Sequence, residues 1–126
     1  MPTLSQALAN KRFLTKLLLD NNKIGAEGAA LLAKGLAANE TLTNLHLANC
    51  QLGEEGTLEI ARVLQNKKNL LVLDMTNNKT GVNGCIAICK SIQHHTTLRE
   101  LYFSNNMIGP DGARHIAKVL ESTKYI

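Results

Sequence analysis

Hydrophobic and polar residues recur along the chain in a pattern with a period of 28 residues. A leucine opens each unit, a second leucine follows three positions later, and a leucine, methionine or phenylalanine follows two positions after that. The opening leucines are Leu14, Leu42, Leu70 and Leu98. A register that persists over four units predicts a repeat protein rather than a single irregular globule.

Each unit contains a strand half and a helix half. Leu17 and Leu19 are two positions apart, which is the period of a strand with one buried face. Leu32 and Leu36 are four apart, which is helical spacing. Two glycines between the halves, as at Gly25 and Gly28, mark the turn and the close approach of neighbouring units. One such unit cannot bury its own apolar face, so we expect the units to stack into a continuous core.

The stack is expected to bend. Parallel strands lie about 4.8 Å apart, whereas adjacent helices need about 10 Å. The sheet must therefore occupy the inner, concave side, and four units give only a shallow arc.

The pattern Leu-x-x-Leu-x-Leu-x-x-Asn-x-Ile-Gly-x-x-Gly-Ala runs from Leu14 to Ala29 and again, with Phe103 at the third leucine, from Leu98 to Ala113. It resembles the ribonuclease-inhibitor subtype of leucine-rich repeats. The resemblance implies an α/β fold: a right-handed strand–helix solenoid with a parallel sheet on the concave face and helices on the convex face. Residues 1–126 would form one domain, with a partial repeat helix at 1–13 and repeats at 14–41, 42–69, 70–97 and 98–125.

Three of the departures from this pattern bear on packing. Cys50 stands at the asparagine position, a substitution that the ribonuclease-inhibitor subtype uses regularly. Met75 and Thr80 are the other departures, and they predict that the third repeat packs less well.

The same resemblance implies a function. Ribonuclease inhibitors, NOD-like receptors, Ran GTPase-activating proteins and bacterial effectors share this repeat type, and binding through the concave sheet is typical of them. We therefore expect a protein–protein interaction module with a protein partner, either as a complete chain or as part of a larger repeat protein. The alternatives are a GTPase-regulating repeat protein and a structural repeat that forms homo-oligomers, because neither end of the sequence carries the polar cap that solenoids need.

In-register parallel strands would place equivalent outward-facing residues in rows across the sheet. A tyrosine and exposed apolar side chains are typical of binding surfaces. An asparagine row at the strand ends recurs in every unit (Asn21, Asn49, Asn77, Asn105), so we interpret it as structural. The predicted partner-binding residues are Lys16, Leu18, Asp20, Asn44, His46, Val72, Asp74, Glu100 and Tyr102.

Several residues that could suggest a metal-binding or catalytic site occupy regular positions of the repeat. Cys85 and Cys89, followed by His94 and His95, have metal-ligand character, but the cysteines occupy positions where other units have alanine. We therefore expect them in the core. Cys50 belongs to the buried asparagine position, where a thiol is usually inert. The glycines recur at the repeat spacing, so they do not form a phosphate-binding loop. The sequence predicts no enzymatic activity, no metal and no cofactor.

The composition argues against several other classes of protein. Hydrophobic residues make up 44% and charged residues 19%, which argues against disorder, and 3% aromatic residues imply an aliphatic core. The net charge of +4 is scattered, unlike the dense basic stripe of a nucleic-acid-binding protein. No apolar run reaches the ~20 residues of a membrane span, and the first residues do not form a secretory signal. Three cysteines favour a reducing, cytoplasmic location, or the host cytosol for an injected effector.

Overall fold

Helices and strands alternate through the whole of the described chain. The computed structural model describes residues 4–93, 95 and 97–123. None of the helices in these residues is long and apolar enough to cross a membrane. The elements are α1 (Leu4–Ala9), β1 (Lys16–Leu18), α2 (Gly25–Ala38), β2 (Asn44–His46), α3 (Gly53–Leu64), β3 (Val72–Asp74), α4 (Gly81–Ile92), β4 (Glu100–Tyr102) and α5 (Gly109–Ser122).

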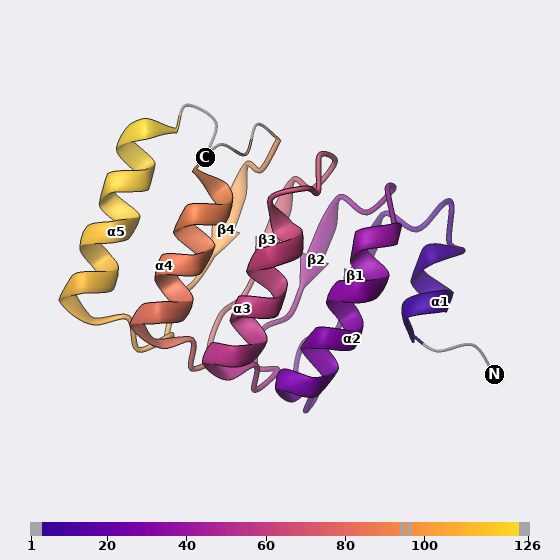
Figure 1. Cartoon of the computed structure of the whole chain (residues 1–126), viewed down its shortest axis with the longest axis horizontal. Coiled ribbons are helices and arrows are strands. Elements are labelled where there is room, and N and C mark those ends of the chain that lie inside the picture. Colours follow the sequence, from indigo (N-terminus) through magenta and orange to yellow (C-terminus); the bar gives the residue numbers. More distant parts are fainter. Residues whose placement is uncertain (1–3, 94, 96, 124–126) are drawn as a thin grey trace.

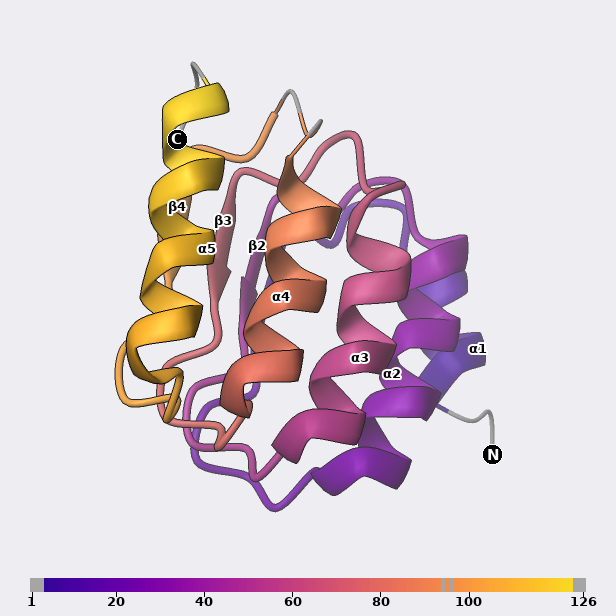
Figure 2. The same ribbon diagram turned by 60° about the vertical axis from the view of Figure 1, so that its left-hand side comes forward.

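The four strands form one parallel sheet in chain order, β1-β2-β3-β4. Leu17 pairs with Leu45, Leu45 with Leu73, and Leu73 with Leu101, so each strand is offset by one 28-residue period. The helices form a second layer on one side of this sheet (Figures 1 and 2). This open arrangement confirms the predicted α/β leucine-rich-repeat solenoid.

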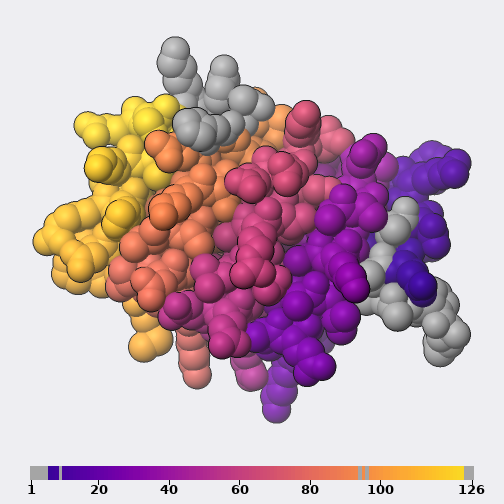
Figure 3. Space-filling view, viewed as in Figure 1, coloured from indigo at the N-terminus to yellow at the C-terminus, as the bar shows by residue number. Residues whose placement is uncertain are grey.

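An aliphatic core fills the space between the two layers. The middle residue of each central strand, Leu45 or Leu73, is buried, and it belongs to the same core as Leu32, Ile60 and Ile88 from the helices. The helices lie side by side from the indigo to the yellow end of the molecule (Figure 1), and the same order of colours runs across the space-filling view (Figure 3). The strand and helix periods therefore predicted the core correctly.

The asparagine row at the strand ends has the structural role that the sequence predicted. Asn21, Asn49, Asn77 and Asn105 all have φ between 56° and 65°. Asparagine tolerates this left-handed region better than most side chains. The Nδ2 of Asn49 also donates to Oδ1 of Asn21 (2.9 Å), and Asn77 donates to Asn49 in the same way (2.5 Å). These side chains thus turn the chain and link neighbouring units.

The following position carries buried asparagines that join one unit to the next. The backbone N–H of Cys50 donates to Oδ1 of Asn78 (2.9 Å). The Nδ2 of Asn78 donates to the carbonyl oxygens of Leu47 (2.7 Å) and Met75 (2.9 Å). Asn106 repeats the arrangement, because its Oδ1 accepts the N–H of Asn78 (2.7 Å). Each buried amide therefore satisfies backbone groups of two adjacent units at once.

The three departures from the repeat pattern are well accommodated. The Sγ of Cys50 donates to the carbonyl of Leu19 (3.1 Å), which replaces one bond of the missing asparagine. Met75 and Thr80 are fully buried, and the hydroxyl of Thr80 donates to the carbonyl of Asn106 (3.3 Å). The prediction that the third repeat packs less well was therefore wrong, because Met75 is fully buried and the buried hydroxyl of Thr80 has a backbone acceptor.

Removing one buried amide should be costly. We expect Asn78→Ala to lower the free energy of unfolding by about 3 kcal/mol, since several buried backbone groups lose their partners. Asn22→Ala is the matched control: Asn22 occupies the equivalent position but is exposed, and it donates only to Leu19 and Asp20 of its own turn. Urea unfolding followed by circular dichroism would measure the free energy of unfolding of both variants. Equal decreases in the two variants would contradict the role assigned to Asn78.

Candidate functional site

The face of the sheet that points away from the helices carries all nine residues predicted to bind a partner. We call it the open sheet face. Strand residues alternate across the sheet, so these side chains lie opposite the leucines of the core. Lys16, Leu18, Glu100 and Tyr102 on the edge strands are exposed. Those of the central strands and the β1 end are half-buried, namely Asp20, Asn44, His46, Val72 and Asp74.

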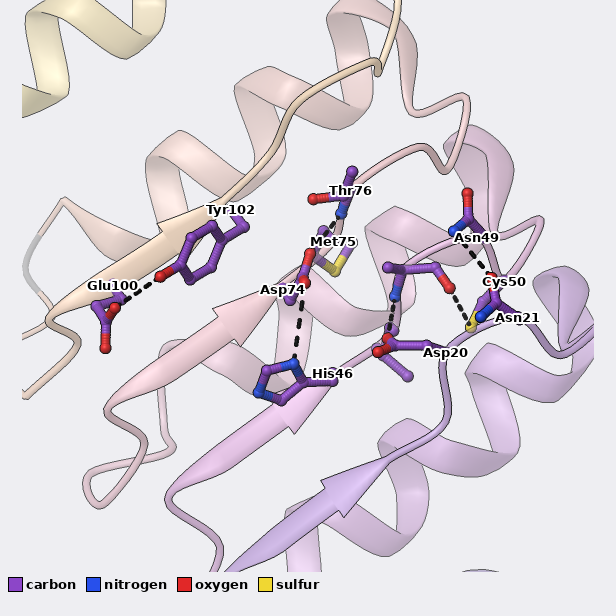
Figure 4. A network of polar contacts seen from close by, with 12 residues as sticks. Asp20, Asn21, His46, Asn49, Cys50, Asp74, Met75, Thr76, Glu100 and Tyr102 are labelled. Carbon is purple, nitrogen blue, oxygen red and sulfur yellow. Dashed lines mark hydrogen bonds and ion pairs between the residues drawn. The ribbon is translucent and has the colours of Figure 1, made fainter.

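A polar cluster occupies the middle of the open sheet face (Figure 4). The pairing of β2 with β3 sets His46 directly beside Asp74, and their Nδ1 and Oδ2 atoms are 3.8 Å apart. Asp20 follows β1, and one ligand atom from each of Asp20, His46 and Asp74 lies within 4.8 Å of the other two. The structure thus brings together His46 and Asp74, which share a row because they are 28 positions apart, and Asp20 of the neighbouring row.

Backbone hydrogen bonds hold both carboxylates of this cluster. The N–H of Ala48 donates to Oδ1 of Asp20 (2.7 Å), and the N–H of Thr76 donates to Oδ1 of Asp74 (2.9 Å). One oxygen of each carboxylate is therefore fixed by the main chain, while Oδ2 of Asp74 faces His46.

A second polar pair lies on the edge strand β4. The hydroxyl of Tyr102 donates to Oε1 of Glu100 (2.7 Å), as Figure 4 shows. This hydrogen bond to a carboxylate raises the pKa of Tyr102, because it stabilises the protonated phenol. Tyr102 is therefore a neutral hydrogen-bonding aromatic ring at the rim of the face.

The apolar residues of the face do not form one patch. Leu18 is 64% exposed and Tyr102 is 47% exposed. They share one row, but His46 and Asp74 stand between them in the pairing order. The face therefore presents a polar centre between two apolar positions.

The charge of this face is opposite to that of the whole chain. Its nine residues include one lysine and three carboxylates, which give a formal charge of −2, whereas the chain carries +4. A cationic group would therefore be favoured at the centre of the face over an anionic one.

The cysteines have the structural role that the sequence predicted. Cys50, Cys85 and Cys89 are buried and unpaired. Burial raises the pKa of all three thiols, and with the nearby Cys85 it raises the pKa of Cys89 to about 12. A thiol held in its neutral form is a poor nucleophile. Of the two histidines that follow them, His94 lies outside the described residues.

His95 has a role that the sequence reasoning missed. The N–H of Leu98 donates to Nδ1 of the buried His95 ring (3.0 Å). Two units earlier, the N–H of Leu42 donates to Oδ1 of Asn39 in the same way (2.9 Å). The 28-residue spacing of positions 39, 67 and 95 was the available signal, but their side chains are chemically unlike.

Asn39 and Lys67 also reach back to the preceding unit. Asn39 donates from Nδ2 to the carbonyls of Leu8 (2.9 Å) and Lys11 (3.2 Å). The Nζ of Lys67 donates to the equivalent carbonyls of Leu36 and Asn39. Burial lowers the pKa of His95, although the carbonyls of Lys67 and Leu64, which are again the equivalent ones, partly oppose this effect.

Comparisons with known proteins agree with this architecture. Segments 10–33, 38–61, 66–89 and 94–117 each match a family model described as "Leucine Rich repeat". A search of curated proteins finds no match. Among solved structures, the chain is similar to "Leiomodin-1 Actin-Binding Site 2 (ABS2)", with a TM-score of 0.78 and 25% sequence identity, over 94% of this chain and 68% of the other.

The neutral His95 should make folding sensitive to acid. Its pKa in the folded state lies below the ordinary 6.5 of the unfolded chain, so the unfolded state binds the proton first as pH falls. The free energy of unfolding should therefore be unaffected above pH ~6.5 and should fall below it, by up to about 1.4 kcal/mol for each pH unit.

His95→Asn supplies the test, because Asn39 already fills the equivalent position. We expect this variant to fold and to lose the His95 contribution between pH 7 and pH 5, measured as the difference from the wild-type chain in urea unfolding. Identical pH dependence in the two proteins would contradict the assignment.

Proposed function

Because the chain belongs to the leucine-rich-repeat family, we propose that it is a protein-binding module whose open sheet face contacts the partner. Repeats of this kind and the similarity to an actin-binding domain indicate a binding module rather than an enzyme. The residues we assign to the contact are the nine of the open sheet face.

The observation that carries this proposal is the exposure of Leu18 and Tyr102 on a face that the helices leave uncovered (Figure 2). Tyrosine is enriched among the few residues that carry most of the binding energy of protein interfaces, and exposed apolar side chains often mark an interaction surface. A leucine at one edge, a tyrosine at the other and a polar cluster between them fit a partner that spans all four strands.

Actin is the first specific partner to test. The solved structure similar to this chain is titled an actin-binding site, and the similarity extends over nearly the whole chain. Co-sedimentation of the purified chain with actin filaments, together with a binding assay for monomeric actin, would decide whether this partner is shared.

The finer classification is also a proposal. The spacing of leucine, asparagine and glycine supports the ribonuclease-inhibitor-like subtype, and three unpaired buried cysteines suit a reducing, cytoplasmic environment. A GTPase-regulating role is the alternative, and stimulation of GTP hydrolysis would be its evidence.

The α5 end supports self-association as a second candidate. Ala33 and Ala61 are buried between helices, whereas the equivalent Ala117 is exposed on α5. Leu120 on the same helix is 48% exposed. Light scattering at several protein concentrations tests this candidate, and a mass that stays at one chain would contradict it.

Changing the open sheet face should abolish partner binding without unfolding the chain. We expect the triple variant His46→Ala, Asp74→Ala, Tyr102→Ala to lose at least about 2 kcal/mol of binding free energy, a typical hot-spot loss. The measurement is a titration against a partner captured with the wild-type chain, or against actin if actin binds.

The matched control changes three exposed residues of the helical face, Lys34→Ala, Lys90→Ala and His115→Ala. This variant should bind like the wild-type chain, and circular dichroism should show that both triple variants are folded. Loss of binding only in the helical-face variant would place the interface on the convex side instead.

A further inference from the structure

We propose that Asp20, His46 and Asp74 form a binding site for one divalent transition-metal ion, such as Zn²⁺, at the centre of the open sheet face. This inference does not depend on the proposed protein partner. The three residues come from three consecutive units, and one ligand atom of each lies within 4.8 Å of the other two.

The sheet explains how these residues meet. His46 and Asp74 are direct partners in the pairing of β2 with β3. Asp20 lies two positions after Leu18, which is the β1 partner of His46, so Asp20 points to the same face from a diagonal position. All three are half-buried, which leaves one side of the cluster open to solvent.

The separations suit atoms that share an ion better than atoms that bond to each other. Nδ1 of His46 and Oδ2 of Asp74 are 3.8 Å apart, beyond hydrogen-bonding distance. Two ligands at about 2.1 Å from a tetrahedral zinc ion are about 3.4 Å apart. Closing the cluster around one ion therefore needs side-chain shifts of about 1 Å.

The carboxylates are already oriented for this purpose. The backbone N–H groups of Ala48 and Thr76 hold Oδ1 of Asp20 and Oδ1 of Asp74. Hydrogen bonds of this kind orient the ligands of metal sites and reduce the ordering that binding requires. Oδ2 of Asp74, which faces His46, is left for the ion.

The donor set selects the class of metal. An imidazole together with two carboxylates suits Zn²⁺ and neighbouring first-row ions. Calcium takes six to eight oxygen ligands, so three side chains with one nitrogen do not suit it. A dication would also neutralise the carboxylates of Asp20 and Asp74, which lie close together in the cluster.

The test is calorimetric titration of the purified full chain with Zn²⁺ at neutral pH in a non-coordinating buffer. We expect one ion per chain, and a higher Tm with Zn²⁺ than without it. His46→Ala, Asp20→Asn and Asp74→Asn should each weaken binding at least about tenfold, a loss that even supporting residues of metal sites cause. The asparagine variants keep the size of the side chain and protect the test against loss of folding.

The control is His115→Ala, which removes an exposed histidine of α5 and should leave the affinity unchanged. Ca²⁺ at the same concentration should neither bind nor raise the Tm. Absence of Zn²⁺ binding, or equal affinity in the wild-type and His46→Ala chains, would overturn the proposal. The titration contains no protein partner, so its failure is distinguishable from failure of the proposed binding function.

Discussion

The parallel register of the strands, with each residue beside its counterpart 28 positions later, is the constraint on which the rest of the molecule depends. Strand pairing alone does not secure it, since each strand is only three residues long. The amides of Asn78 and Asn106 add hydrogen bonds to backbone groups of the adjacent unit. These bonds can form in only one alignment of neighbouring units. A shift of one residue would leave these buried groups unpaired, which is costly.

The candidate site is a direct result of this register. A short strand contributes only two or three side chains to the open sheet face, too few for a binding surface. Stacking in register turns those few into rows, so that His46 of one unit meets Asp74 of the next. Each unit can therefore change its outward residues without changing the core, because the two sets point to opposite faces of the sheet.

The sequence predicted the features that recur in every unit, but it did not predict the side-chain contacts that occur in only one or two units. Leucine, glycine and asparagine recur in every unit, so the strands, helices, core cysteines and structural asparagines followed from their spacing. Asp20 lies on a diagonal with His46, and its approach depends on side-chain rotation that row positions do not define. His95 was missed for a different reason. An amide, an ammonium and an imidazole occupy one position. Asn39 and His95 accept equivalent N–H groups, and Asn39 and Lys67 donate to equivalent carbonyls, which no residue type reveals.

The buried asparagine bonds have a further consequence for how the molecule opens. Each of them joins a unit to its immediate neighbour and to nothing more distant, so the chain behaves as a line of coupled units. A central unit is held from both sides, whereas β1 and β4 each have one neighbouring strand. Backbone amides of β2 and β3 should therefore exchange with solvent more slowly than those of the outer strands, giving a gradient of protection along the sheet. The most slowly exchanging part would then lie directly beneath His46 and Asp74, so that the centre of the open sheet face has the most rigid support.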